Sequence, residues 1–141
     1  MTLHTPEFRT LTISETNTAD RIIRMGDVYR IAFPAYGEES SSVQGGIRPA
    51  IIVSNDQNNK HSSTVQVIPI TTSRIKKTRA YPMHVLIPAD GKLLESVAMV
   101  EQLSTISKTW IVSERISTVS PEILIKLGAA FRIQFPISQF A

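Results

Sequence analysis

Short apolar segments separated by turn residues follow one another along the chain from Met25 onward. Segments of this length, bounded by Gly, Pro, Asn, Asp and Ser, predict β-strands. We expect strands near 27–33, 48–54, 64–71, 83–88, 96–101 and 109–112. Their spacing is too close for a helix between each pair, so the sheet should be mostly antiparallel and form a compact sheet or small barrel.

One segment near the C-terminal end, "SPEILIKLGAAFRIQF", has helical periodicity instead. Ser120 suits the N-cap, Pro121 suits the first turn, and Glu122 is favoured there by the helix dipole. The apolar stripe expected to pack on the sheet consists of Leu124, Leu127 and Phe131. The pattern therefore predicts a mainly β domain with one C-terminal helix.

The rest of the organisation is simple. Residues 1–24 lack strong periodicity and are rich in Thr and Ser, so we expect an N-terminal extension over 1–24 and one folded domain over 25–141. A chain of 141 residues can bury one real core but not two independent ones. The segment "PAYGEESSSVQGG", 34–46, is long for a hairpin connection and is either a functional loop or a hairpin tip.

Apolar runs such as "PAIIV" fall well short of the roughly 20 residues that span a bilayer, and the N-terminal residues lack the apolar core of a signal peptide. We therefore expect a cytoplasmic protein without a membrane partner. The absence of cysteine agrees with a reducing compartment and excludes thiol chemistry.

Positive charge is concentrated in one part of the chain, although the formal net charge is only +3. The segment from 57 to 89 contains no acid and five bases, namely Lys60, Arg74, Lys76, Lys77 and Arg79. A local positive field favours a polyanion bound on one face. For the run "RIKKTR" alone, a solvated basic loop is the alternative.

Arg48 stands directly before Pro49, at the start of the apolar run "PAIIV". A core strand needs no cation at its entrance, whereas a guanidinium can hold two phosphate oxygens at once. In the run "VIPIT", Pro69 precedes Thr71 by two residues. Because proline cannot donate to a ladder, we expect an edge strand or a bulge beside Thr71. The hypothesis is a phosphate site at Arg48.

Four fragments, "GDVYRIAF", "QGGIRPAIIVSND", "VQVIPITTS" and "SVAMVEQLSTISK", resemble in order and separation the MazF/PemK family of bacterial toxin endoribonucleases. The resemblance covers about residues 25–135. It implies a small SH3-like β-barrel with a C-terminal helix, a homodimer, sequence-selective cleavage of single-stranded RNA, and inhibition by a cognate antitoxin protein.

The same resemblance places the family's catalytic arginine, which precedes proline, at Arg48 and its catalytic threonine at Thr71, with Gln102 near the site. Ser104 stands where many members carry arginine, which bears on how RNA beside the cut is held. The residues expected to contact RNA are Gln44, Gln102, Arg74, Lys76, Lys77 and His84.

Cleavage through the ribose 2′-hydroxyl requires stabilised charge on the phosphoryl oxygens and proton transfer at both ends, and Arg48 suits the first requirement. The sequence leaves the general base open. His84, which alternates along a strand, is a stronger rival for acid–base work than His61 in a polar turn or His4 in the extension. Trp110 is expected in the core or a dimer contact, or stacked on a base.

No metal or cofactor is expected, because Asp27 and Asp56 lie at strand ends where Asp ordinarily caps turns, without a carboxylate cluster around them. The expected activity is metal-independent cleavage that leaves a 2′,3′-cyclic phosphate and a 5′-hydroxyl. Two alternatives remain open: a gyrase-inhibiting toxin of the same fold, and a non-enzymatic nucleic-acid-binding barrel.

Overall fold

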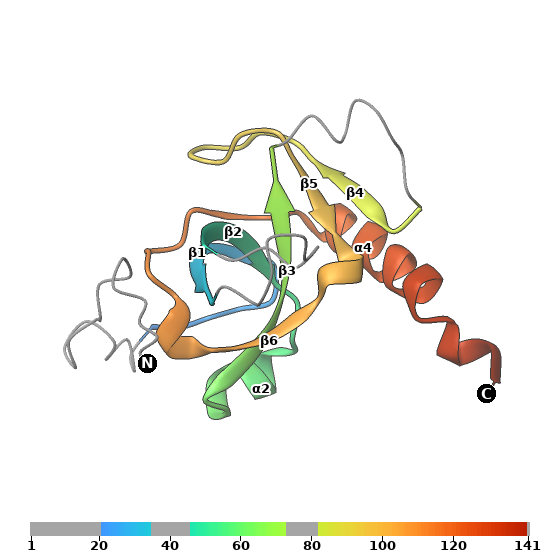
Figure 1. Ribbon diagram of the computed structural model, residues 1–141, viewed down its shortest axis with the longest axis horizontal. Helices are drawn as coiled ribbons and strands as arrows, with labels where there is room; N and C mark the ends of the chain where they lie inside the picture. The colour runs from blue at the N-terminus through green and yellow to red at the C-terminus, as the bar shows by residue number, and fades with distance from the viewer. Residues whose placement is uncertain (1–20, 35–45, 73–81, 141) are drawn as a thin grey trace.

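The computed structural model describes residues 21–34, 46–72 and 82–140 (Figure 1). Its strands are β1 (Asp27–Phe33), β2 (Gly46–Ile52), β3 (Thr64–Thr71), β4 (His84–Ile87), β5 (Ser96–Met99), β6 (Ser104–Ser107) and β7 (Ser117–Thr118). The helices are α2 (Asp56–His61) and α4 (Pro121–Gln134), with short 3-10 helices η2 (Val100–Gln102), η3 (Lys108–Trp110) and η4 (Pro136–Phe140). None of the described helices is long and apolar enough to cross a membrane.

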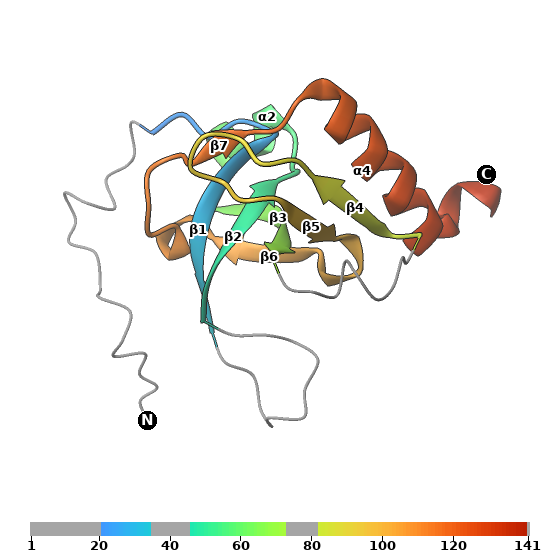
Figure 2. The same ribbon diagram turned by 90° about the horizontal axis from the view of Figure 1, so that it is seen from above.

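The strands form one curved sheet in the order β4-β5-β3-β2-β1-β7, and β6 also pairs with β3. All of these pairings are antiparallel, which confirms that expectation. Figure 2 shows α4 running along β4 at one side of this sheet, and α4 packs against β4 and η2. The mainly β fold with a C-terminal helix is therefore as predicted.

Alternation along the strands creates two apolar cores, one on each face of the sheet. The first contains Ile51, Ile70 and Ala98 together with the buried side chains of α4. The second contains Ile31, Ala50 and Val67. Because consecutive residues serve opposite cores, the interior strands read as nearly continuous apolar runs.

The C-terminal helix begins as its sequence indicates. The Ser120 hydroxyl oxygen accepts from the Ile123 backbone N–H at 3.2 Å, and Pro121 and Glu122 occupy the first turn. The predicted apolar stripe is partly wrong. Leu127 is buried, but Phe131 is 40% exposed, and the buried face is completed by Ile123 and Ala130. The buried face of α4 therefore runs through Ile123, Leu127 and Ala130, and Phe131 lies at its edge.

Several element boundaries also differ from the prediction. The strand expected near 109–112 is wrong, because residues 108–110 form η3, whose N-cap Ser107 accepts from the Thr109 N–H at 3.2 Å. Only Ile111 makes a strand-like bridge, to Ile31. The strand expected to reach 101 ends at Met99, where η2 begins. Strands β6 and β7 and the short helix α2 were not predicted, since they are too short for a clear periodicity.

Pro69 was expected in an edge strand or a bulge, and the edge strand is wrong. Strand β3 pairs with β2 on one side, and on the other with β6 up to Val67 and with β5 from Ile70. Gln66 accepts from the Val53 N–H at 2.9 Å on the β2 side, so by alternation Pro69 faces the other side. Its missing N–H thus falls where β3 changes partner from β6 to β5.

Candidate active site

A second proline parts β2 from β3. The β2–β3 ladder runs from Ile52↔Val67 to Ala50↔Pro69 and ends there. The next hydrogen-bonded position would join Pro49 to Ile70, because the alternation set by Val53 and Gln66 recurs every two residues. Pro49 has no N–H to donate to Ile70, so the ladder stops at the Arg-Pro dipeptide.

A cleft of about 380 Å³ lies where the two strands part. Three consecutive residues of β2, 47–49, line it together with three consecutive residues, 70–72, at the end of β3. Consecutive residues of a strand point to opposite faces of the sheet, so residues from both faces border the cleft. This is expected when a gap opens between neighbouring strands. Arg48 and Thr71, the two residues expected to be catalytic, therefore lie in one site.

Arg48 is half-buried beside its β1 partner Ile31. Burial lowers the pKa of the Arg48 guanidinium from its ordinary value, since desolvation disfavours the charged form. The same partial loss of water strengthens the attraction between this cation and a bound anion. A phosphate at Arg48 would thus interact more strongly than at an exposed surface arginine.

Thr71 is held by its backbone. It pairs with Val97 on β5, one residue beyond the Ile70↔Ala98 pair. Because the ladder to β2 has ended and the ladder to β5 continues, Thr71 stays with β5 while Arg48 stays with β1. The two side chains are consequently attached to separate, rigidly paired strands on either side of the cleft, as a preorganised site requires.

The cleft also contains residues that the sequence did not single out. Arg30, Lys92 and the buried Ser96 line it, and none of its lining residues is acidic. Arg30 could have been noticed as a cation between the apolar residues of "VYRIAF", and Lys92 as part of the turn sequence "DGK". Their approach to Arg48 is a consequence of topology and has no local signal.

His84 and Gln102 do not line the cleft. His84 pairs with Met99 on β5, and its Nε2 lies 3.0 Å from a carboxylate oxygen of Glu101. Gln102 follows Glu101 in η2 and its carbonyl oxygen accepts from the Ser104 hydroxyl at 2.9 Å. By strand alternation His84 shares a sheet face with Val97 and hence with Thr71.

Some expected site residues lie outside the described residues: Gln44, Arg74, Lys76 and Lys77, together with most of the 34–46 loop and His4. His61 ends α2 and Trp110 is half-buried against the second core. Asp27 accepts from the Arg24 N–H within a turn, whereas Asp56 accepts from the Met25 N–H and ties the start of α2 to the segment before β1. Within the described ranges no three His, Asp or Glu side chains are grouped so that they could hold a metal ion.

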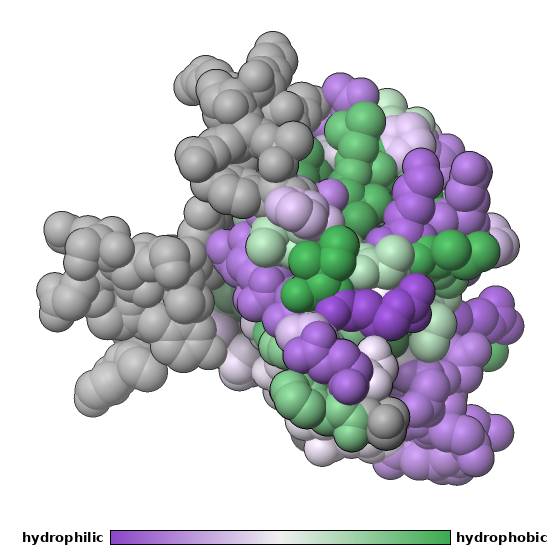
Figure 3. Space-filling view, turned by 90° about the vertical axis from the view of Figure 1, so that its right-hand side faces the viewer, coloured by the Kyte–Doolittle hydropathy of each residue, from purple (hydrophilic) through white to green (hydrophobic). Residues whose placement is uncertain are grey.

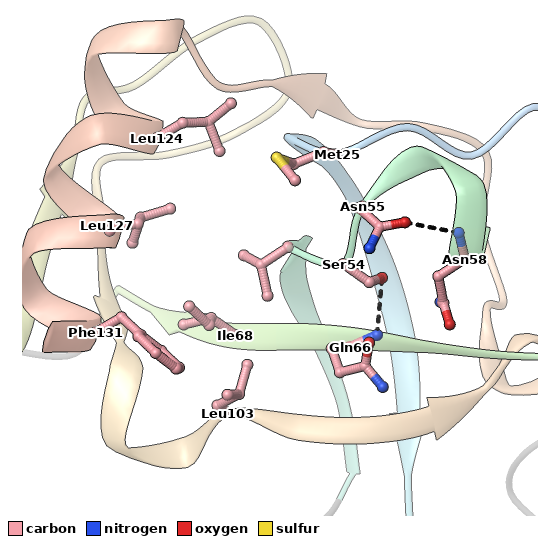
Figure 4. Close-up of a pocket in the computed structure, with 12 residues that line it drawn as sticks. Met25, Ser54, Asn55, Asn58, Gln66, Ile68, Leu103, Leu124, Leu127 and Phe131 are labelled. Atoms are coloured by element: carbon pink, nitrogen blue, oxygen red, sulfur yellow. Dashed lines mark hydrogen bonds between the residues drawn. The ribbon is translucent and has the colours of Figure 1, made fainter. Parts of the chain in front are cut away.

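A larger hollow of about 530 Å³ lies elsewhere, between α4 and the sheet. Figure 4 shows Leu124, Leu127 and Phe131 facing Ile68 and Leu103 across it. The far end is polar, where Ser54 accepts from the Gln66 N–H at 3.0 Å and Asn55 from the Asn58 N–H at 2.8 Å. We refer to this hollow as the α4 groove.

The side of the molecule that carries α4 is rich in exposed apolar residues. Figure 3 shows hydrophobic side chains gathered in a band across it. The large exposed apolar residues of α4 and η4 are Ile125, Phe131, Ile133, Ile137 and Phe140. A continuous apolar surface of this kind on a folded protein usually marks a contact with another protein.

Comparison with known proteins agrees with this architecture. Residues 24–135 match the family described as PemK-like, MazF-like toxin of type II toxin-antitoxin system. MazF from Deinococcus radiodurans has a similar structure, with a TM-score of 0.68 and 18% identity over 82% of this chain and 97% of that one.

Two mycobacterial structures are also similar. An endoribonuclease from a mycobacterial species, solved in complex with its cognate antitoxin, has a TM-score of 0.63 and 24% identity over 81% of this chain and 95% of that one. Toxin MazF-mt6 of Mycobacterium tuberculosis has a TM-score of 0.62 and 20% identity over 78% and 96%. At these identities the likeness concerns the fold.

Proposed function

The chain belongs to the PemK-like, MazF-like toxins of type II toxin–antitoxin systems, and from this premise we propose that it is a metal-independent, sequence-selective endoribonuclease that cleaves single-stranded RNA in the cytoplasm. The observation that carries the proposal is the position of Arg48 and Thr71 on the two parted strands of one cleft. An anion can enter this gap between two fixed strands and meet a cation and a hydroxyl together.

The proposed reaction uses the RNA's own 2′-hydroxyl as nucleophile. Its oxygen forms a bond to phosphorus and loses its proton, the bond from phosphorus to the 5′-oxygen breaks, and that oxygen takes up a proton. The products are a 2′,3′-cyclic phosphate and a 5′-hydroxyl. Arg48 stabilises the charge that develops on the phosphoryl oxygens, and the Thr71 hydroxyl donates to one of them or to a sugar oxygen.

The surroundings of the cleft favour RNA over other anions. The cleft holds three cations and no carboxylate among its lining residues, and the basic segment 74–79 follows β3 directly in the sequence. Positive charge around a phosphate site raises the rate and affinity with which a polyanion is captured. Gln44, Gln102, Arg74, Lys76, Lys77 and His84 remain the residues expected to contact the bases and the flanking backbone.

We also propose two protein partners. One is a cognate antitoxin, since a similar mycobacterial endoribonuclease was solved with its antitoxin bound. The other is a second copy of this chain, docked over the α4 groove and the exposed Phe131 at its edge. Burial of Phe131 and its neighbours in a homodimer would remove the apolar surface that the single chain leaves in water.

Purified protein incubated with mixed single-stranded RNA in excess EDTA tests the proposal. Fragments ending in a 2′,3′-cyclic phosphate are the expected result, and a variant with Arg48 replaced by Ala should give none. Binding without cleavage would instead indicate a nucleic-acid-binding barrel. Inhibition of DNA supercoiling by gyrase, with RNA left intact, would indicate the gyrase-directed toxin.

A further inference from the structure

The turn between β4 and β5 carries Lys92 to the cleft on a rigid support. Asp90 and Leu93 exchange two backbone hydrogen bonds of 2.8 Å, and Gly91 between them has a φ of 57°, the left-handed region that glycine adopts without strain. Leu93 is 5% exposed and belongs to the first core. The backbone on both sides of Lys92 is therefore fixed.

A further contact ties this turn to the opposite side of the sheet. The Ser117 hydroxyl donates to Asp90 at 2.9 Å, and Ser117 belongs to β7, which pairs with β1. This hydrogen bond therefore links the turn before β5 to β7, at the other end of the strand order. Asp90 is thereby engaged with Ser117, and it is not among the residues that line the cleft.

Arg30 reaches the cleft from β1. Its backbone N–H donates to the Ser113 hydroxyl at 2.9 Å, and its carbonyl oxygen accepts from the Val112 N–H at 3.0 Å. Its side chain and that of Lys92 are both exposed at the cleft, and neither makes an ion pair within the described part of the chain. Two cations are thus presented to the cleft in addition to Arg48.

The size and walls of the cleft exceed what one phosphate needs. Its volume of about 380 Å³ falls within the range of small-molecule sites, roughly 300–1,000 Å³. Ile47 and Leu94 border it while remaining 50% and 70% exposed, so apolar surface is available beside the cations. This combination of paired cations and exposed apolar side chains suits a nucleotide, which has both a charged phosphate and an apolar sugar and base face.

We propose that Arg30 and Lys92 bind a phosphate adjacent to the scissile one, so that the cleft holds at least two consecutive phosphates of a single RNA strand. This inference rests on the proposed ribonuclease function. It adds that the RNA substrate must be long enough to place two consecutive phosphates in the cleft. Arg48 and Thr71 act on the phosphate that is cut, while Arg30 and Lys92 fix the register of the strand. Loss of either outer cation therefore weakens binding without removing the catalytic groups.

Salt-dependent binding tests this arrangement independently of cleavage. The probe is a labelled, fully 2′-O-methylated RNA of mixed sequence, which cannot be cut, and the variants are Arg30→Gln and Lys92→Gln. For each variant the slope of log K against log salt should become shallower by about 1, because one phosphate contact is lost. The matched control is Lys126→Gln on the exposed face of α4, which should leave the slope unchanged.

A chemical substitution in the substrate then locates the contact. One flanking phosphate at a time is replaced by a neutral methylphosphonate in an oligonucleotide with a single cleavable ribose. Replacement of the phosphate that Lys92 contacts should slow cleavage by the wild-type protein about tenfold. The same replacement should have no further effect on cleavage by the Lys92→Gln variant. Lys92→Arg, which keeps the charge, should restore the sensitivity.

The two proposals fail in different ways. If wild-type protein cuts RNA and Arg48→Ala does not, but Lys92→Gln and Arg30→Gln bind with the wild-type salt slope, the outer phosphate site is wrong and the ribonuclease assignment stands. If the protein binds the methylated RNA with the expected slopes but never cuts RNA, the ribonuclease assignment is wrong. Equal methylphosphonate effects in wild type and Lys92→Gln also overturn the outer site.

Discussion

Arg48 and Thr71 occupy facing positions in the β2–β3 register, two residues beyond the last ladder pair, Ala50↔Pro69. The strands have parted there, so a cleft separates the two residues where a sheet would otherwise continue. We attribute the parting to Pro49, which has no N–H to donate to the Ile70 carbonyl oxygen. The proline of the Arg-Pro dipeptide thus has a structural role in opening the site that Arg48 serves.

Arg48→Ala should abolish RNA cleavage and leave the fold intact. The side chain is half-buried but belongs to neither apolar core, so its removal costs little packing. Loss of a group that stabilises transition-state charge lowers the rate by on the order of 10²–10³, and a guanidinium on a phosphate could contribute more. The measurement is the single-turnover rate, with circular dichroism to verify folding. A variant that cuts at near wild-type rate would remove Arg48 from the mechanism.

Thr71→Val preserves shape and β-propensity and removes only the hydroxyl. We expect unchanged thermal stability and a cleavage rate lower by about 10²-fold, the usual cost of one lost donor at a developing charge. Thr71→Ser is the matched control, because it keeps the hydroxyl and should retain most of the activity. Equal rates for the Val and Ser variants would show that the hydroxyl has no part in the reaction.

Pro49→Ala tests whether the proline holds the strands apart. Alanine supplies the N–H that could pair with the Ile70 carbonyl oxygen and extend the ladder toward Arg48 and Thr71. The expected result is about tenfold slower cleavage with unchanged or greater stability, since a ladder hydrogen bond contributes about 1 kcal/mol. Amide exchange at position 49 should be slow in this variant.

Pro69→Ala is the matched control for that experiment. Its new N–H would face the place where β3 changes partner from β6 to β5, away from β2. Cleavage should therefore stay close to the wild-type rate. If both proline variants lose activity equally, a general effect on β3 is responsible and the specific role of Pro49 is wrong.

The sequence was sufficient for the fold class, and it nominated Arg48 and Thr71, which line one cleft in the structure. Their catalytic roles stay predictions. Apolar segments with turn residues between them predicted the antiparallel sheet, and the N-cap Ser120 marked the helix start correctly. Arg48 was recognisable locally as a cation before an apolar run, whereas Thr71 was nominated through a family resemblance. Their common cleft agrees with the resemblance to MazF/PemK toxins.

The remaining site residues depend on how distant parts of the chain meet. Lys92 lies in a turn that is held by a hydrogen bond from Ser117 to Asp90. Ser117 is 25 residues further along the chain than Lys92, so no local pattern indicates this contact. Pro69 was expected in an edge strand or a bulge because its missing N–H is visible in the sequence. The change of β3's partner from β6 to β5, which accommodates Pro69, is not visible there. The short helix η3 begins at its N-cap Ser107. This one capping contact outweighs the apolar pattern of "WIV", which had predicted a strand.

Phe131→Glu should convert the proposed homodimer to a monomer. Phe131 borders the α4 groove and is 40% exposed in the single chain, so a charge there is tolerated by the monomer but would be buried without a partner in the dimer. Analytical ultracentrifugation gives the mass. Ile125→Glu is the control, because Ile125 is 72% exposed on the same helix and does not line the groove. A Phe131→Glu protein that stays dimeric would place the interface elsewhere.

The last prediction concerns the nucleophile. If the 2′-hydroxyl attacks phosphorus, an RNA with one deoxyribose or 2′-O-methyl ribose on the 5′ side of the cut must resist cleavage, because the attacking oxygen is absent or blocked. Its binding should persist, since the contacts proposed for Arg48, Arg30 and Lys92 are to phosphates and not to the 2′ position. The unmodified RNA should be cut equally well in excess EDTA and leave a 2′,3′-cyclic phosphate. A metal-activated water would tolerate the 2′ change and stop in chelator. Cleavage of the 2′-deoxy substrate at an unchanged rate would overturn this chemistry, even for a protein that proved to be a ribonuclease.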